Sequence, residues 1–316
     1  MTDFTFAVFT YNQAGYIVEQ LESIRYQIEN YGSCISCRLL MCDDHSTDNT
    51  VSVAKCWIEK YSGLFSDIRV VVPEHNQGVV KNFLSCLDNI ETQDFKILAG
   101  DDLYASNNVF ELYEKSNFVI TAPLTFADGH VNPVRIKKCQ AFIWLFGAKD
   151  LFKKINKELP YATPWLAPAV FFKKELITGE VIDTLKQYKW IEDKPLFYCF
   201  FKDTNTKPVI VKKPYILYRS GAGVSAKKNK KVNTEYETEE ALIFKRYMWK
   251  ATCLPKVINP FVYYKLLRRL KYTLLSKIKG SEIAMFLNDM EKEKAKAEEY
   301  YSLILSRKEA FIKEFK

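Results

Sequence analysis

Two kinds of apolar pattern alternate along the first 120 residues of the chain. Short continuous apolar runs predict buried strands. They occupy residues 4–9, 38–42, 68–72 and 95–98. Between them, apolar residues recur every three or four positions, which predicts amphipathic helices. These helices cover residues 17–31, 51–61 and 79–90. Strands and helices in regular alternation predict an α/β fold with a mostly parallel sheet flanked by helices.

The pattern changes in the rest of the chain. Residues 120–206 are rich in proline and aromatic residues and predict an irregular half of the same domain. Residues 207–231 contain eight Lys and Arg and no acid, and with their glycines they predict a mobile basic loop. Helices are expected from about residue 235 onward, with 289–316 charged and helix-prone. We therefore predict a main domain over 1–234 and a C-terminal helical region over 235–316. The first of these would have a ligand-binding half, 1–120, and an irregular half with the basic loop, 121–234.

Polar segments follow all four predicted strands. They comprise Thr10-Tyr11-Asn12, residues 43–48, residues 74–78 and Asp101-Asp102. In open α/β sheets, ligands bind beyond the carboxyl ends of the strands, so these segments are expected to converge on one edge.

Asp101 and Asp102 are adjacent carboxylates at the end of a buried strand. Such a pair loses hydration and repels itself unless a cation lies close by. Oxygen ligands suit a hard divalent ion such as Mg²⁺ or Mn²⁺. The alternative is an N-cap, since Asp before Leu103 and Tyr104 can open a helix.

No glycine-rich phosphate loop follows any predicted strand. A metal on acidic residues is the other way to neutralise a diphosphate, and Asp101-Asp102 fits that role. Asp44 could accept a hydrogen bond from a base N–H such as that of uracil. Its segment is also a good helix start, with Ser46 or Asp48 as the cap.

A third acidic pair, Glu192-Asp193, precedes an aromatic run over residues 197–201. A carboxylate near apolar side chains can have a raised pKa and act as a general base. Helix capping is the alternative for this pair as well.

Composition limits the class of protein. The chain has 316 residues, 48% of them hydrophobic, and no apolar run near the roughly 18 residues of a membrane span. It enters a strand-like run at residue 4, so we expect no signal peptide. Eight scattered cysteines predict reduced thiols in a cytoplasmic protein; a zinc or redox role for Cys34 and Cys37 is the less favoured alternative.

Charge is divided unevenly along the chain. Residues 1–206 hold 21 Lys and Arg against 26 Asp and Glu, a net −5, and residues 207–316 hold 25 against 12, a net +13. The basic part predicts an anionic partner: a nucleic acid, a membrane surface or a phosphate-bearing substrate. Basic and aromatic residues interleave over 255–279, as on a helix at an anionic bilayer. Packing on the body or a homodimer contact are the alternatives, and the lack of a nucleic-acid-binding module disfavours nucleic acid.

Together these segments resemble the family 2 glycosyltransferases with the GT-A fold. Thr10-Tyr11-Asn12 and residues 23–27 are similar to the family's opening motif, and residues 42–50 to its DDxSxDxT motif. Residues 76–82 are similar to its N-x-G…N segment, and residues 99–102 to its metal-binding DxD. Later in the chain, Glu192-Asp193 is similar to its ED motif and Tyr218-Arg219 to its YR motif.

The resemblance implies an inverting transfer of a sugar from a nucleotide-sugar donor, with UDP favoured. Asp102 would hold Mn²⁺ or Mg²⁺, Asp193 would be the catalytic base, and Glu192 and Arg219 are further candidates. The donor-binding residues would be Thr10, Tyr11, Asn12, Asp44, Lys81 and Asp101. The family's QxxRW motif is absent, which favours transfer of one sugar over polymer synthesis.

The same resemblance suggests a glycan acceptor, linked to a lipid diphosphate, in capsule or surface polysaccharide synthesis at the inner face of a bacterial membrane. Two other functions stay open. A sugar-phosphate nucleotidyltransferase would normally have a glycine-rich basic N-terminal loop, which this chain lacks. A non-catalytic nucleotide-sugar-binding relative would not need a base.

Overall fold

The computed structural model describes residues 2–127, 130–133, 167–202, 208–222, 230–247, 277 and 279–314. Its first sheet contains four parallel strands in the order β3-β2-β1-β4. Their bounds are β1 Thr2–Thr10, β2 Ile35–Asp43, β3 Asp67–Val71 and β4 Asp94–Ala99. All four strands were predicted from their apolar runs, each within three residues at either end.

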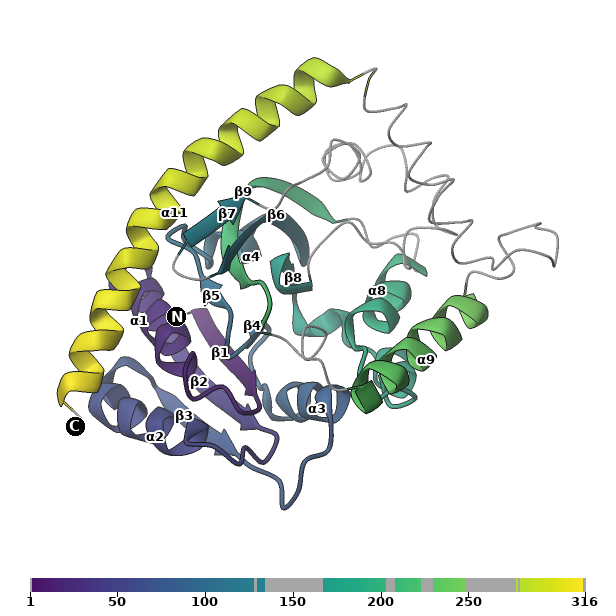
Figure 1. Ribbon diagram of the computed structural model, residues 1–316, viewed down its shortest axis with the longest axis horizontal. Coiled ribbons are helices and arrows are strands. Elements are labelled where there is room, and N and C mark those ends of the chain that lie inside the picture. The colour runs from purple at the N-terminus through teal and green to yellow at the C-terminus, as the bar shows by residue number, and fades with distance from the viewer. Residues whose placement is uncertain are drawn as a thin grey trace.

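Helices cover both faces of this sheet (Figure 1). They are α1 Ile17–Tyr31, α2 Thr50–Tyr61 and α3 Val79–Asn89. Alternate β1 side chains point to opposite faces. Phe6 and Val8 pack with α1 and α2, whereas Ala7 packs with α3. The predicted α/β class with a mostly parallel sheet is confirmed for the first half of the chain.

A second, mixed sheet has the order β5-β9-β6-β7, with β8 paired to β6. Its strands are β5 Leu103–Tyr104, β6 Phe118–Ala127, β7 His130–Pro133, β8 Val170–Phe172 and β9 Val209–Arg219. Strand β9 runs parallel to β6 and antiparallel to β5.

This second sheet corrects two expectations. The segment after Asp102 is strand β5 and does not open a helix, so the N-cap interpretation of Asp101-Asp102 was wrong. We predicted a loop over residues 207–231, and this prediction was wrong for residues 209–219, which form strand β9. Tyr215, Ile216 and Leu217 follow the lysines of this strand and are buried in the core. Residues 223–229 lie outside the described part.

The remaining elements are mostly helical. Their bounds are η1 Ser62–Leu64, α4 Glu111–Lys115, η4 Ala167–Ala169, η5 Lys174–Leu176, α7 Gly179–Leu185, α8 Asp193–Lys202, α9 Lys230–Tyr247 and α11 Gly280–Glu314. The division into domains at residue 234 stays a prediction, and α9 runs across that position. Among the described helices, none is long and apolar enough to cross a membrane. Of the amphipathic segment 255–279, all but residues 277 and 279 lie outside the described part.

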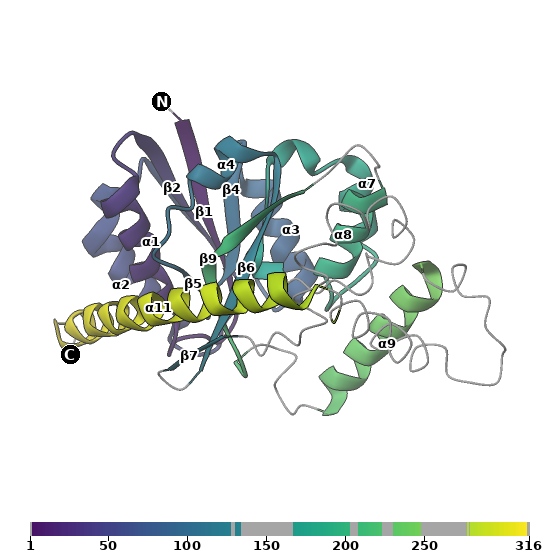
Figure 2. The ribbon, with the colours of Figure 1, turned by 90° about the horizontal axis from the view of Figure 1, so that it is seen from above.

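Helix α11 lies along the body and contacts α1, β7 and β9 (Figures 1 and 2). It buries a row of side chains that includes Phe286, Met290, Tyr301 and Ile304. The Tyr300 ring packs edge-on against Tyr26 of α1, with 4.8 Å between ring centroids. The described C-terminal helix therefore packs on the α/β body.

A buried carboxylate joins α11 to the rest of the fold. Glu19 of α1 pairs with the guanidinium of Arg219 on β9, and both side chains are less than one tenth exposed. From α11, the Tyr301 hydroxyl donates to the same carboxylate at 3.2 Å and the Lys308 ammonium at 2.7 Å. The Glu19 carboxylate of α1 therefore binds side chains from both β9 and α11, which are distant from it in sequence.

We expect Glu19→Ala to lower the free energy of unfolding by about 3–5 kcal/mol, because the Arg219 guanidinium would stay buried without its counter-ion. Urea unfolding measures the change. Glu29→Ala is the matched control: Glu29 pairs with Arg25 and Arg307 at the surface and should contribute about 1 kcal/mol or less. Similar small losses in the two variants would contradict the prediction.

Candidate active site

The carboxyl end of β1 is the point at which the polar segments meet. The Thr10 carbonyl accepts from the backbone N–H of Asp44 at 2.9 Å and from the Asn82 amide at 3.3 Å. The Phe9 carbonyl accepts from Gly100 N–H at 3.1 Å. The predicted convergence of these segments on one sheet edge is confirmed.

Gly100 allows the approach between β1 and the turn after β4. A Cβ atom at this position would lie 2.6 Å from Gln13 Oε1 and 3.0 Å from Thr10 Oγ1. The Thr10 hydroxyl donates to Gln13 Oε1 at 2.7 Å, so both atoms are held in place. A larger residue would push the Asp101-Asp102 turn away from β1.

The turn after β2 is held by its own polar side chains. The Asp43 carboxylate accepts from Ser46 N–H at 2.6 Å, and Asp48 accepts from Thr50 N–H at 2.9 Å at the start of α2. Asn12 adopts a positive φ of 53°, and its N–H donates to Ser46 Oγ at 2.8 Å. Asp48 therefore holds the first residue of α2 from outside the helix, whose N-cap is Asn49, and Asn12 is tied to this turn.

Asp44 holds the start of α3. Its carboxylate accepts from the N–H groups of Gln77 at 2.7 Å and Gly78 at 2.8 Å, and Gly78 has a positive φ of 95°. Burial raises the pKa of Asp44 above its usual range. Lys81 lies three residues further along α3 and is exposed, and Tyr11 is half-buried after β1.

Asp101 and Asp102 are buried, and Arg219 contacts both. The Arg219 N–H donates to Asp102 Oδ1 at 2.8 Å, and its guanidinium Nε donates to the Asp101 carbonyl at 2.8 Å. Burial, and then the charge of Asp101, raise the pKa of Asp102 well above its usual range. The Arg219 side chain also lies over the rings of Tyr16 and Phe126.

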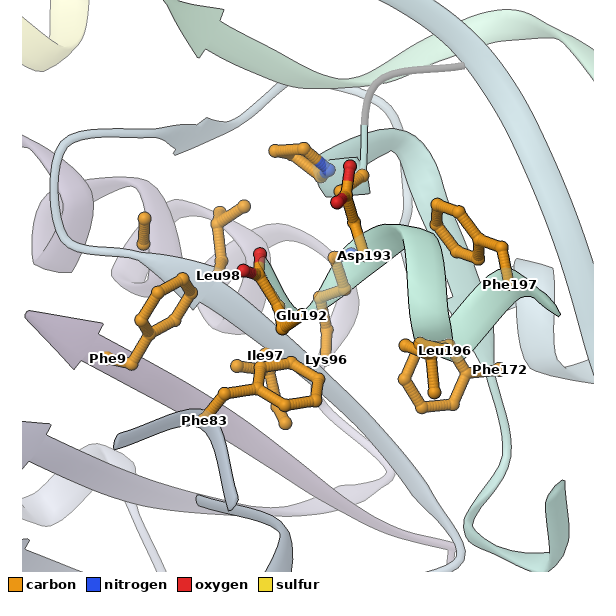
Figure 3. A pocket seen from close by; sticks show the side chains of 13 residues that line it. Phe9, Phe83, Lys96, Ile97, Leu98, Phe172, Glu192, Asp193, Leu196 and Phe197 are labelled. Carbon is orange, nitrogen blue, oxygen red and sulfur yellow. The ribbon is translucent and has the colours of Figure 1, made fainter. Parts of the chain in front are cut away.

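A cavity of about 60 Å³ lies next to this turn (Figure 3). Its lining residues are Phe9, Phe83, Lys96, Ile97, Leu98, Ala99, Ala167, Pro168, Phe172, Glu192, Asp193, Leu196 and Phe197. In Figure 3 the Glu192 carboxylate points toward Leu98, and Asp193 stands closer to Phe197. The acidic pair therefore faces a mostly apolar chamber.

Lys96 is a buried cation on the cavity wall. Its ammonium donates to the Val170 carbonyl at 2.7 Å and lies 4.7 Å from the centroid of the Phe171 ring. Burial lowers the pKa of Lys96 to about 7, and the charge of Asp102 partly opposes this effect. Lys96 was not predicted from the sequence, although a single charge inside an apolar strand could have identified it.

The pKa values of Glu192 and Asp193 are both raised, which is the direction that a general base needs. Burial and the charge of Asp193 raise the pKa of Glu192 to about 8, and burial raises the pKa of Asp193. Asp193 is also the first residue of α8, and its Oδ1 accepts from Lys194 N–H at 2.7 Å. Asp193 therefore both begins a helix and has a raised pKa.

Tyr218 of β9 lies close enough to both acidic pairs for their charges to affect its pKa. Burial raises its pKa to about 12, with further contributions from Asp102, Asp101, Asp193 and Glu192. From the sequence, Tyr218 was predicted only as part of the YR motif, without a role of its own. Both acidic pairs therefore lie near this phenol, the first after β4 and the second at the start of α8.

No cluster of three or more His, Cys, Asp or Glu side chains suitable for a metal occurs among the described residues. A metal at Asp102 would therefore need further ligands from a bound molecule or water. The cysteines in the described part are free, Cys34 is exposed, and burial raises the pKa of Cys37 to about 12.

Several solved structures are similar to this chain in fold. One is S. aureus TarS 1-349 in complex with UDP-GlcNAc, with a TM-score of 0.48, 17% identity and coverage of 78% of this chain and 67% of that chain. Another is the mannosyltransferase PcManGT from Pyrobaculum calidifontis in complex with GDP-Man and Mn²⁺, with a TM-score of 0.45, 17% identity and coverage of 90% and 74%.

Sequence comparison identifies the family. A curated relative, described as an uncharacterized glycosyltransferase MG025 homolog of Mycoplasma pneumoniae, is 24% identical over 196 residues. That match covers 62% of this chain and only 60% of the relative's length. The sequence pattern of glycosyl transferase family 2 matches residues 5–167, which is more than half of the chain. The chain therefore belongs to glycosyl transferase family 2.

Proposed function

We propose that this enzyme transfers one sugar from a UDP-sugar to a hydroxyl of a glycan acceptor, with inversion at the anomeric carbon. The observation that carries the proposal is the cavity that brings Glu192 and Asp193 to the carboxyl end of β4, next to the Asp101-Asp102 turn. One pair lies at the carboxyl end of β4 and suits a metal-bound diphosphate, and the other faces the apolar cavity and suits a base.

The donor nucleotide would lie along the edge formed by the ends of β1, β2 and β4. Asp44 supports this placement, because each of its carboxylate oxygens accepts one backbone N–H and keeps a second lone pair for a base N–H. The other proposed donor-binding residues are Thr10, Tyr11, Asn12, Lys81 and Asp101.

Asp102 is the proposed ligand of Mn²⁺ or Mg²⁺. The residues fit such an ion, since Asp102 is buried beside a second carboxylate and its pKa is raised by that burial. When bound, the ion would neutralise charge on the departing diphosphate. A single fixed carboxylate leaves most coordination positions for the donor and water, which is the usual arrangement for Mg²⁺.

Asp193 is the proposed base. It would take the proton from the acceptor hydroxyl while that oxygen forms a bond to the anomeric carbon. The bond between this carbon and the diphosphate oxygen breaks on the opposite face, so the configuration inverts. Glu192, with its pKa near 8, would hold a proton at neutral pH and limit the negative charge beside Asp193.

Arg219 is better suited to positioning than to contact with the leaving group. Its guanidinium is occupied by Glu19 and by the Asp101 carbonyl, and the side chain is buried. We propose that it fixes the Asp101-Asp102 turn.

For the acceptor we propose a glycan carried on a lipid diphosphate, in capsule or surface polysaccharide synthesis. The net charge of +13 over residues 207–316 supports an anionic carrier at the inner face of a bacterial membrane. The interleaved basic and aromatic residues of 255–279 are the proposed contact with that membrane, and a homodimer contact there is the alternative.

We expect Asp193→Asn to abolish sugar transfer, because Asn cannot accept the hydroxyl proton, while affinity for UDP is retained. UDP release from UDP-glucose, UDP-galactose and UDP-N-acetylglucosamine with Mn²⁺ and water as acceptor measures the rate, and calorimetry measures UDP binding. Asp183→Asn, at an exposed position on α7, is the control. Full activity in Asp193→Asn would remove this residue as the base.

Asp102→Asn should lose the Mn²⁺-dependent part of UDP affinity, since Asn keeps an oxygen for the Arg219 N–H but not the charge that binds the ion. Calorimetry of UDP with and without Mn²⁺ measures the difference. Asp88→Asn, exposed on α3, should retain the full metal effect. An unchanged metal effect in Asp102→Asn would exclude Asp102 as the ligand.

Glu192 should make stability depend on pH. Its pKa is raised from 4.5 to about 8 on folding, so its stabilising contribution is complete below pH 4.5 and is lost as pH rises through about 8. Gln resembles the protonated acid at every pH. We therefore expect the melting temperature of Glu192→Gln to rise relative to the unaltered chain between about pH 5 and pH 9. Glu180→Gln, exposed on α7, controls for the loss of one charge; a constant difference for Glu192→Gln across this range would refute the prediction.

A further inference from the structure

Helix α9 directs an acidic group toward the segment that precedes the proposed base. Within the basic region 207–316, residues 235–240 contain four Glu. Glu235 and Glu239 are four positions apart and so share one helix face. This face contacts residues 189–191, and the neighbouring Glu240 pairs with Lys194.

Glu239 makes an unusual set of hydrogen bonds with that segment. Its carboxylate accepts from three successive backbone N–H groups: Lys189 at 2.5 Å, Trp190 at 2.8 Å and Ile191 at 3.0 Å. Successive N–H groups that converge on one anion form a nest, and bonds to a charged acceptor are stronger than those between neutral groups. The indole of Trp190 also donates to Glu235 at 3.0 Å.

The same segment is tied to the donor edge on its other side. The Lys189 carbonyl accepts from Val80 N–H at 3.0 Å in the first turn of α3. That turn is held by Asp44 through Gln77 and Gly78. Residues 189–191 are therefore held between α3 and α9, directly before Glu192-Asp193.

We infer that Glu239 is a positioning residue that sets the location of the Glu192-Asp193 pair by anchoring residues 189–191. The inference rests on the proposed function, because it assigns the pair its role as base. Tyr236 of α9 supports it: burial, and then the charge of Asp193, raise the pKa of Tyr236, so α9 lies next to the pair itself.

The test uses the full chain with Mn²⁺ and the three UDP-sugars named above. Glu239→Ala should lower kcat for UDP release by about 100-fold, the size of effect expected for a misplaced catalytic group. KM for the donor should stay unchanged, because the donor edge is intact. Glu239→Gln keeps the side-chain volume and one acceptor oxygen and should be intermediate. Glu237→Ala, exposed on the same helix, should match the unaltered chain.

Two further measurements separate positioning from general loss of fold. Amide hydrogen exchange over 189–191 should accelerate in Glu239→Ala while β1 and α1 stay protected. Added formate should partly restore kcat in Glu239→Ala, because a small carboxylate can occupy the nest, and it should leave Glu237→Ala unaffected.

An unaltered kcat in Glu239→Ala would overturn the inference, as would a lower kcat without faster exchange at 189–191. The exchange measurement needs no donor, so the two proposals can fail separately. Absence of UDP release in the unaltered chain would count against the proposed function alone.

Discussion

The burial of two neighbouring carboxylates after β4 is the constraint on which the arrangement of this enzyme depends. Asp101 and Asp102 lie where water cannot solvate them fully, so positive charge and N–H donors must surround them. Arg219 supplies a backbone N–H and a guanidinium, and Lys96 lies near Asp102. Arg219 is itself buried and needs Glu19, which in turn is shared with Tyr301 and Lys308 of α11.

A comparable line of contacts holds the other acidic pair. Asp44 fixes the first turn of α3, this turn bonds to the Lys189 carbonyl, and Glu239 of α9 takes the three N–H groups that follow. Both acidic pairs are thus supported by elements from the last third of the chain. The parallel sheet supplies the edge, and β9, α9 and α11 supply the groups that keep the carboxylates in place.

The first half of the fold could be predicted because its signals are local. The apolar run at residues 4–9 and the helical spacing over 17–31 correspond to β1 and α1. Strand β9 was missed because its lysines dominate the composition, while its pairing with β6 depends on residues about 90 positions earlier in the chain.

The candidate site divides in the same way. Asp44, Asp102 and Asp193 could be selected from motifs, and the structure brings the acidic pairs near Tyr218. Lys96 had a local signal, a single charge inside an apolar strand, that was overlooked. Glu239 could not be selected, since its significance comes from partners 48–50 positions away in the sequence. The role of Arg219 also depended on Glu19, 200 positions away.

The contact between Glu19 and Lys308 joins residues 289 positions apart. During synthesis, the parallel sheet can form while the ribosome is still adding the second half of the chain. The Glu19 carboxylate can bind Tyr301 and Lys308 only after α11 has left the ribosome. The buried charge around Arg219 is therefore completed late in biogenesis, and the nascent chain passes through a stage in which the sheet exists but its charged centre does not.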